Sequence, residues 1–443
     1  MIRTPQPVRG TQSLLGIEAD RFARVITTFN AVRRRFRFSR VFVPLIEHTE
    51  VFARSIGETT DVVSKEMYTF LDKGDESITL RPELTAGISR AYVSERWQHN
   101  IPLKVGSWGP AFRYERPQKG RFRQFHQVDA EIIGAPESSA DIELLAFAAQ
   151  FLDELKVTDL VDLRINTLGD TESRLAWRVA LSTYFRRHLS SLSAESIKRL
   201  DANPLRILDS KDSGDRELIR DAPVIDDFLS SESGKFFDEV VRGLDNLGVR
   251  YSRDKALVRG LDYYRHTAFE FVTGALGAQG TVLGGGRYDG LIETLGGAST
   301  PAVGWAAGVE RLALLAPPKI RKTRIFAIVP ENDASEGLSQ KIANRLRRGG
   351  AAVDYLYRGS AKKRLEKLQR RGATTALFIN AIDDDSEVIG SINIKQYRRF
   401  SSTEASVANN LRDLFDVLSF YDLQEEGNFR GSRADIILRR PKA

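Results

Sequence analysis

AFRYERPQKGRFRQFHQVDAEIIG, residues 111–134, contains two strand-like stretches on either side of a basic segment. We predict that FRYE and QFHQVDAEII form antiparallel strands, in which alternate side chains share one face of the sheet. The first strand then places Arg113 and Glu115 on one face. The second strand places four reactive or stacking side chains on one face: Phe125, Gln127, Asp129 and Glu131.

The segment between these strands, RPQKGRFR, is basic and too long for a tight hairpin turn. We therefore predict that it projects towards something anionic. An ordinary solvated hairpin is the alternative, but solvated hairpins rarely cluster this chemistry on one face.

LVRGLDYYRHTAFEFV, residues 257–272, is a second unusual stretch. It inserts Arg259 and Asp262 among apolar neighbours and sets Tyr263 beside Tyr264, and the glycine-rich LGGGRYDGL follows at 283–291. That turn lacks the lysine and hydroxyl of a P-loop and the spacing of a dinucleotide fingerprint. Taken alone, the tyrosines are better explained as a structural aromatic pair in a core.

Composition limits the classes of protein. A chain of 443 residues with 42% hydrophobic residues predicts two to four domains with substantial cores. There is no cysteine, and the five histidines show no ligand spacing, so we expect no disulfide and no protein-bound metal site. Neither a signal pattern nor a long apolar run is present, which predicts a cytoplasmic protein without membrane contact.

The basic surplus lies in the last part of the chain. From Lys319 onwards there are 24 Lys and Arg against 16 Asp and Glu, whereas the preceding residues are nearly balanced. RGSAKKRLEKLQRR, residues 358–371, is a dense cluster of Lys and Arg, which suits binding to phosphate backbones. A solvated helix face is the alternative.

The hydrophobic pattern predicts three regions. Residues 1–318 mix helices and strands in an α+β pattern and contain a mostly helical insertion at about 171–247. Residues 319–420 alternate strand and helix, which predicts an α/β domain with a mixed sheet. Residues 421–443 are polar and are expected to form a loosely held tail.

FRYERPQKGRFRQF resembles the second signature motif of class II aminoacyl-tRNA synthetases, and LVRGLDYY with GGGRYDGL resembles the two motifs peculiar to histidyl-tRNA synthetases. The resemblance extends to TLRPELTAG (79–87), to VFVPLIE around Pro44 and to GVERLALL with Arg311. It covers most of residues 1–316 with strong motifs and residues 320–420 with weaker ones.

The resemblance implies an antiparallel-sheet catalytic core with a helical insertion that clasps the acceptor arm, and a C-terminal α/β anticodon-binding domain. It implies a homodimer that activates L-histidine with ATP and Mg²⁺ and transfers it to tRNA(His). A non-catalytic regulatory subunit of histidine biosynthesis is the alternative, disfavoured because Arg113, Arg259 and Arg311 are all present. A class II synthetase for another amino acid is disfavoured by LVRGLDYY.

The resemblance also implies roles for single residues. Arg259 and Arg113 are the expected catalytic residues at the α-phosphate. The expected histidine pocket consists of Glu83, Thr85, Gln127, Glu131, Tyr263, Tyr264 and Tyr288. ATP is expected to contact Arg113, Glu115, Phe125, Arg259 and Arg311. The acceptor end of the tRNA is expected to meet Arg116, Gln118, Lys119, Arg121 and Arg123.

One residue departs from the family pattern. Leu84 stands where the family commonly has glycine between the glutamate and the threonine. We therefore expect the pocket wall at Leu84 to be shifted or crowded.

Overall fold

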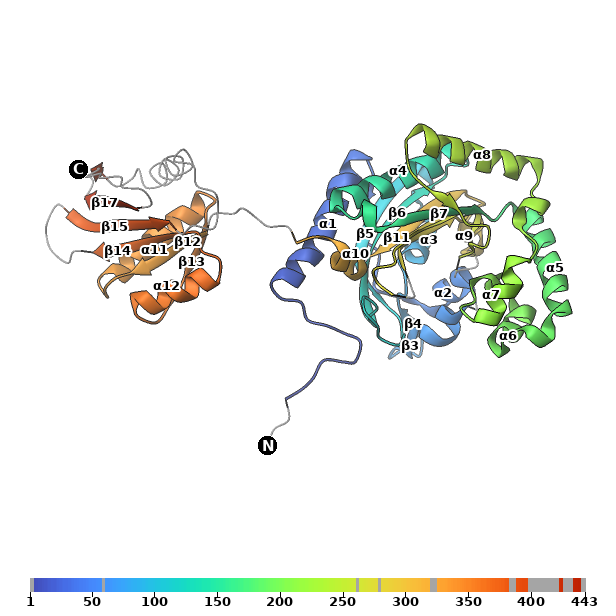
Figure 1. Ribbon diagram of the computed structural model, residues 1–443, viewed down its shortest axis with the longest axis horizontal. Coiled ribbons are helices and arrows are strands. Elements are labelled where there is room, and N and C mark those ends of the chain that lie inside the picture. Colours follow the sequence, from blue (N-terminus) through green and yellow to red (C-terminus); the bar gives the residue numbers. More distant parts are fainter. Residues whose placement is uncertain are drawn as a thin grey trace. The chain divides into compact units, whose positions relative to one another are not determined.

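The computed structural model describes residues 4–57, 60–259, 263–277, 280–318, 325–381, 388–396, 422–424 and 433–439. The chain divides into two compact units, Met1–Lys319 and Ile320–Ala443. Each unit is built around its own large sheet (Figure 1).

In the described part of the first unit, eight strands form one sheet in the order β1-β5-β6-β11-β10-β9-β7-β8. Their bounds are β1 (Ser39–Arg40), β5 (Leu103–Phe112), β6 (Gln124–Ile133), β7 (Asp162–Thr167), β8 (Ser252–Arg253), β9 (Arg265–Val272), β10 (Thr281–Arg287) and β11 (Ala302–Gly308). In this spatial order, neighbouring strands between β5 and β7 pair antiparallel. The two-residue edge strands β1 and β8 pair parallel with β5 and β7. The predicted antiparallel sheet is confirmed.

The β5–β6 pair differs from the prediction at one end. β5 ends at Phe112, so FRYE belongs mostly to the connection. The Arg113 N–H still donates to the Arg123 carbonyl at 2.9 Å, but the Tyr114 N–H donates to the Glu66 carbonyl at 2.7 Å. This second bond turns the chain away from β6, so the expected alternation holds for β6 and not for FRYE.

One face of the large sheet is covered by helices. The apolar residues of β6, Val128, Ala130 and Ile132, are buried in a core that also takes residues from four helices. These are α1 (Ile17–Arg35), α4 (Ser138–Leu155), α8 (Ser231–Asn246) and α10 (Val309–Leu315). In α1 the buried residues recur at helical spacing, with acidic residues in the first turn and basic residues in the last, which favours a helix that packs on one side.

The opposite face carries smaller elements (Figure 1). They are α2 (Thr49–Ile56), the π-helix η1 (Val62–Glu66), α3 (Thr85–Ser94), α9 (Leu291–Thr294) and a sheet of β2 (Ile46–His48), β4 (Ser77–Leu80) and β3 (Tyr68–Leu71) in the order β2-β4-β3. A second core cluster joins α3 to this face of the large sheet. The polar residues of β6 point to the same side and are not covered by the helical layer.

The stretch expected to be helical contains α5 (Thr171–Arg187), α6 (Ala194–Ala202), α7 (Ser213–Arg220) and α8. Trp177, Leu181 and Phe185 of α5 are fully buried at helical spacing. Asp170 caps α5 by accepting from the Ser173 N–H at 2.8 Å. Figure 1 shows α5, α6 and α7 grouped at one end of the first unit.

In the described part of the second unit, six strands form a mixed sheet in the order β13-β12-β14-β15-β17-β16. Their bounds are β12 (Ile325–Pro330), β13 (Ala352–Tyr355), β14 (Thr375–Ala381), β15 (Val388–Gln396), β16 (Asp422–Gln424) and β17 (Arg433–Arg439). The helices α11 (Ser335–Arg348) and α12 (Ala361–Arg370) each contribute to a separate core cluster. The loosely held tail expected over 421–443 is wrong for β16 and β17, because β17 pairs with β15 and β16 pairs with β17.

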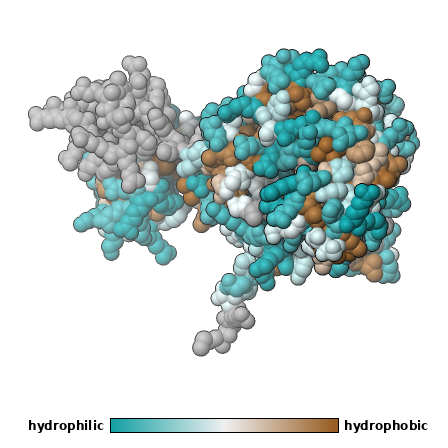
Figure 2. All heavy atoms as spheres, turned by 45° about the vertical axis from the view of Figure 1, so that its right-hand side comes forward, coloured by the Kyte–Doolittle hydropathy of each residue, from teal (hydrophilic) through white to brown (hydrophobic). Residues whose placement is uncertain are grey.

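The described surface is mixed in character. Figure 2 shows hydrophilic side chains over much of one face of the first unit, with apolar residues between them. Among the large apolar residues that stay exposed are Phe42, Leu45 and Ile46, which belong to or adjoin the VFVPLIE segment. Within the described ranges, no helix is both long enough and apolar enough to cross a membrane.

Candidate active site

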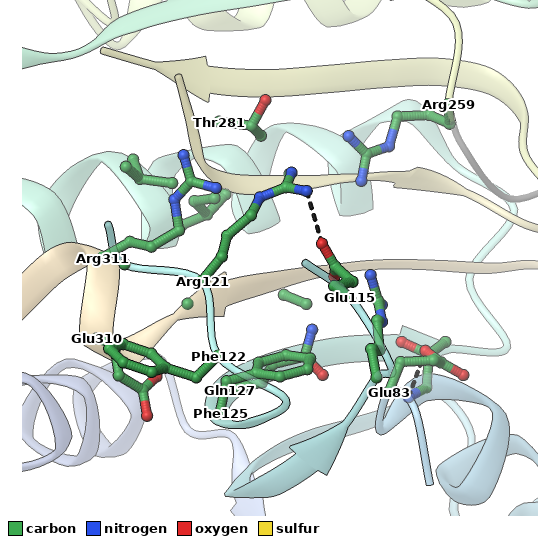
Figure 3. A pocket seen from close by; sticks show the side chains of 18 of the residues that line it. Glu83, Glu115, Arg121, Phe122, Phe125, Gln127, Arg259, Thr281, Glu310 and Arg311 are labelled. Carbon is green, nitrogen blue, oxygen red and sulfur yellow. Dashed lines mark hydrogen bonds and ion pairs between the residues drawn. The ribbon is translucent and has the colours of Figure 1, made fainter. Parts of the chain in front are cut away.

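A pocket opens over the polar face of β6 (Figure 3). Its walls come from the β4–α3 connection, the β5–β6 connection, β6, β10, β11 and the start of α10, which lie far apart in the sequence. It brings together many of the residues expected from the sequence: Glu83, Thr85, Arg113, Glu115, Phe125, Gln127, Arg259, Tyr263, Tyr264 and Arg311. Tertiary folding therefore places the separate motifs around one space.

The pocket has room because the strand beside the polar residues of β6 carries small residues. We call these polar residues the polar row; its members are Gln127, Asp129 and Glu131. The residues of β11 paired with the polar row are Gly308, Ala306 and Gly304. A Cβ on Gly304 would lie 1.3 Å from Glu131 Oε2. The Glu131 carboxyl therefore lies over the backbone of β11, where only glycine leaves space for it.

Glu131 is fixed by two hydroxyl groups at the back of the pocket. Tyr288 Oη donates to Oε2 at 2.6 Å, and Thr85 Oγ1 donates to Oε1 at 2.7 Å. Burial raises the pKa of Glu131 to about 8, although both hydroxyl groups act in the opposite direction. These contacts place Glu131 and Tyr288 with the expected pocket residues, although neither lines the open part of the cavity.

Glu83 is held by the start of α3. The Thr85 N–H donates to Oε2 at 3.0 Å, and the Ala86 N–H donates to Oε1 at 2.7 Å. Helix N-termini leave such donors unpaired, so the carboxyl is fixed in position. Burial raises the pKa of Glu83, and the Ala86 N–H and the charge of Arg113 oppose that shift. Leu84 is buried in the core and does not line the pocket, so the expected crowding at Leu84 is wrong.

Arg259 is held by an ion pair. Its Nη1 donates to Glu270 Oε1, and Glu270 Oε2 accepts from Thr281 Oγ1 at 2.7 Å. Burial lowers the pKa of Arg259, but the Glu270 charge acting together with Tyr264 and Tyr263 outweighs burial, and the net shift is upward. A Cβ on Gly284 would lie 2.6 Å from Nη1, so glycine makes room for the guanidinium group. Asp262 lies outside the described residues.

Three tyrosines form one wall. The ring centroids of Tyr263 and Tyr264 lie 4.5 Å apart, and those of Tyr263 and Tyr288 lie 5.7 Å apart. The Arg259 guanidinium carbon lies 5.3 Å from the centroid of the Tyr264 ring. Since all three tyrosines are buried, the wall is rigid, largely apolar and able to exclude water.

The other end of the pocket is rich in arginine (Figure 3). The Arg113 guanidinium carbon lies 5.5 Å from the centroid of the Phe125 ring. Arg121 Nη1 donates to Glu115 Oε2 at 2.7 Å. Burial and the neighbouring Arg121 lower the pKa of Arg311 to about 10, so Arg311 still carries its charge at neutral pH. This end suits an anionic ligand with a flat ring.

The comparisons with known proteins agree with this geometry. The family model described as histidyl-tRNA synthetase matches residues 10–312. The chain belongs to the histidyl-tRNA synthetase family. It is 59% identical over 383 residues to the histidine–tRNA ligase of Novosphingobium aromaticivorans. The match covers 85% of this chain and 91% of that relative.

Two further relatives extend this likeness of the chain to histidyl-tRNA synthetases. The histidine–tRNA ligase of Gluconacetobacter diazotrophicus is 49% identical over 402 residues, with 91% of this chain and 96% of the relative covered. The crystal structure of the apo S. aureus histidyl-tRNA synthetase matches with a TM-score of 0.72 at 32% identity, covering 92% of this chain and 99% of that one. The fold is therefore that of a class II synthetase.

The histidyl-tRNA synthetase motifs missed several lining residues. Phe122, Thr281 and Glu310 line the pocket. Thr281 begins the strand that carries the glycine-rich turn, and Glu310 directly precedes Arg311. Both therefore lie in or next to a motif identified from the sequence. Arg121, expected at the tRNA, instead lies in the pocket and pairs with Glu115. No sequence pattern separates an inward from an outward arginine in this connection.

The connection between β5 and β6 is more compact than expected. Gln118 and Arg121 exchange backbone hydrogen bonds of 3.1 and 2.9 Å, which makes a tight turn at its tip. Arg116 and Gln118 are exposed. Arg123 is half-buried. Its guanidinium carbon lies 3.8 Å from the centroid of the Tyr114 ring, and its backbone N–H donates to the Gly10 carbonyl at 2.7 Å. The turn therefore presents only part of the expected set to solvent.

Proposed function

We propose that this chain is a histidine–tRNA ligase, which activates L-histidine with ATP to histidyl-adenylate and transfers the acyl group to the 3′ end of tRNA(His). The observation that supports this best is the placement of buried carboxyl groups beside guanidinium groups around one pocket. Glu83 and Glu131 suit the cationic and imidazole parts of histidine, while Arg113 and Arg259 suit phosphate oxygens.

Histidine occupies the part of the pocket around the Glu131 carboxyl. Glu83 and Thr85 bind the α-amino group, since both line the pocket beside the start of α3. Hydroxyl groups and ring faces can bond an imidazole and exclude water. The remaining histidine contacts are Gln127, Glu131, Tyr263, Tyr264 and Tyr288.

ATP occupies the arginine-rich end. Arg113 and Arg259 bind the α-phosphate, and Arg311 reaches the distal phosphates. The histidine carboxylate attacks the α-phosphorus and pyrophosphate leaves, while the two guanidinium groups neutralise the charge that builds up. Phe125 stacks on the adenine ring, and Glu115 accepts from its amino group.

The tRNA meets two surfaces. Arg116, Gln118 and Arg123 contact the acceptor end, whose terminal ribose hydroxyl takes the acyl group from the adenylate. The second unit binds the anticodon, with α12 as the basic surface. On this helix Lys362, Lys363 and Lys367 are exposed, which suits phosphate contacts.

Mg²⁺ enters with the nucleotide. Within the described residues, no group of three or more His, Cys, Asp or Glu is placed to hold a metal ion. Oxygens of the β- and γ-phosphates would supply most of its ligands, because Mg²⁺ prefers oxygen ligands. The ion adds positive charge to that end of the ATP.

The protein acts as a homodimer in the cytoplasm. The exposed Phe42, Leu45 and Ile46 around Pro44 favour burial against a second copy. Sedimentation at micromolar concentration should give twice the chain mass of 49.7 kDa. A monomer alone under those conditions would contradict the dimer.

A regulatory subunit without catalysis remains the second candidate. It would not need a charged arginine at three points of one pocket, as Arg113, Arg259 and Arg311 provide here. ATP/pyrophosphate exchange with each amino acid in turn separates the two functions. We expect exchange with histidine alone; exchange with another amino acid, or with none, would overturn the proposed ligase.

A further inference from the structure

Asp129 is a buried carboxyl group without a hydrogen-bond donor. The residue has 0% exposure, and neither Oδ1 nor Oδ2 accepts a hydrogen bond from any residue in the described ranges. A buried polar atom left unpaired costs free energy, so native proteins seldom keep one without a reason. The roles proposed above leave Asp129 unused.

Asp129 lies on the pocket side of the sheet. The alternation of β6 places it between Gln127 and Glu131, and its partner on β11 is Ala306, which lines the pocket and leaves space above the sheet. Gln127 Oε1 is also buried and unpaired within the described residues. Gln127 and Asp129, at alternate positions of β6, therefore present acceptor oxygens that no donor in the described residues bonds.

The charges around Asp129 favour a cationic ligand. Burial raises its pKa well above the usual value, and the neighbouring carboxyl groups of Glu131 and Glu83 add to this shift, while Arg81 and Arg113 oppose it. Arg81 is the alternative partner: its Nε and Nη1 donate to backbone carbonyls of β5 and of the segment before β2, and its Nη2 lies over Gly109 without a hydrogen bond to Asp129. The carboxyl groups of Glu131 and Glu83 beside that of Asp129 therefore favour a positively charged ligand.

We propose that Asp129, together with Glu83 and Gln127, accepts hydrogen bonds from the α-ammonium group of histidine and so sets the affinity for the amino acid. This inference rests on the histidine site proposed above. An ammonium group has three N–H donors, which match acceptors arranged around one point. A carboxylate is the strongest acceptor for it, because both partners are charged.

The variant Asp129→Asn keeps the shape and removes the charge. Its affinity is measured by calorimetry for L-histidine and for imidazolepropionate, which has the ring and the carboxylate but no α-amino group. We expect the Kd for histidine to rise about 10-fold or more and the Kd for imidazolepropionate to stay unchanged. The thermal midpoint of the ligand-free variant should equal or exceed that of the wild type, because an unpaired buried carboxyl has been removed.

Asp215→Asn is the matched control. Asp215 is also a fully buried carboxyl, but it accepts from the hydroxyl groups of Ser193, Ser196 and Ser210 at 2.6 to 2.7 Å, away from the pocket. Its substitution should lower the thermal midpoint and leave both affinities unchanged. The control thus separates the loss of any buried carboxyl from the loss of this one.

Three results would overturn the inference. Equal losses of affinity for both ligands would show that Asp129 does not act on the amino group. Unchanged histidine affinity with a lower thermal midpoint, or failure of Asp129→Asn to fold, would make Asp129 a countercharge for Arg81. If the proposed ligase function itself were wrong, the wild type would neither bind histidine nor catalyse exchange. That result is different from any failure of the Asp129 inference.

Discussion

Arg259 is held in position by its ion pair with Glu270. A structural role and a catalytic role predict different results for this arginine. If Arg259 only anchors its segment through the ion pair, substitution lowers stability and spares the chemistry. If it neutralises charge at the α-phosphate, its contribution is larger in the transition state than in the ground state.

We expect Arg259→His to slow histidyl-adenylate formation by about 10²-fold or more, as for other preorganised charge-stabilising donors. Arg259→Lys should recover only part of the rate, because an ammonium group cannot bridge two oxygens in a planar fork. Rapid-quench measurement of adenylate beside a thermal melt tests both variants. A less stable variant with a normal single-turnover rate would establish the structural role instead.

Glu131 should make the stability of the ligand-free protein depend on pH. Burial raises its pKa from 4.5 to about 8, so the native protein keeps a proton that the unfolded chain releases between these values. The stabilising contribution is full below the unfolded pKa and is lost as the pH rises through about 8. In Glu131→Gln, the thermal midpoint should fall less steeply between about pH 5 and pH 8. Parallel slopes for wild type and variant would contradict the raised pKa.

At the scale of elements, β11 leaves space for the Glu131 carboxyl, because its paired residue is glycine. In Gly304→Ala the new methyl group would occupy the position of Oε2, at 1.3 Å, so the Glu131 carboxyl must move away from Tyr288 and Thr85. We expect the KM for histidine to rise about 10-fold or more, as for loss of a charge-assisted contact, with little change in the KM for ATP. Exchange kinetics with each substrate varied in turn give both constants.

Gly234→Ala is the control for Gly304→Ala. Gly234 lies within α8, and nothing lies within 4 Å of a Cβ placed on it. Alanine in a helix interior should raise stability by about 0.5–1 kcal/mol and leave both KM values unchanged. Equal effects of the two substitutions on histidine would show that the Gly304 contact is not the cause.

The turn between β5 and β6 should serve tRNA rather than ATP. Arg116 and Gln118 are exposed at this turn, whereas Arg121 pairs with Glu115 in the pocket. The double variant Arg116→Ala, Gln118→Ala should slow transfer to tRNA more than pyrophosphate exchange, and charging should lose part of its salt dependence. Charging and exchange assays at two salt concentrations measure this, and a larger loss in exchange would place the turn on ATP.

At the scale of the whole molecule, the two units are separate compact bodies with their own cores. A chain that stops after Lys319 keeps every residue of the pocket and loses the basic surplus. We therefore expect adenylate formation to stay largely intact while tRNA charging weakens. Exchange and charging assays on the shortened chain decide this, and equal loss of both activities would show that catalysis needs the second unit.

The sequence by itself determined the antiparallel sheet, the polar row of β6 and the motifs that meet in the pocket. These features follow from local periodicity and from residue types with few alternative uses, such as alternating side chains along QFHQVDAEII. The same local reasoning failed for residues 433–439, because their apolar run is short and flanked by charged residues, and the strand is completed by pairing with β15.

Only the tertiary structure decided which charged groups meet. It pairs Arg259 with Glu270, turns Arg121 inward to Glu115 and leaves Asp129 buried without a donor among the described residues. It also buries Leu84 in the core instead of crowding the pocket. The physical reason is that pairing, burial and the pKa of a side chain depend on groups that are distant in the chain, and periodicity reports only which side of an element a residue faces.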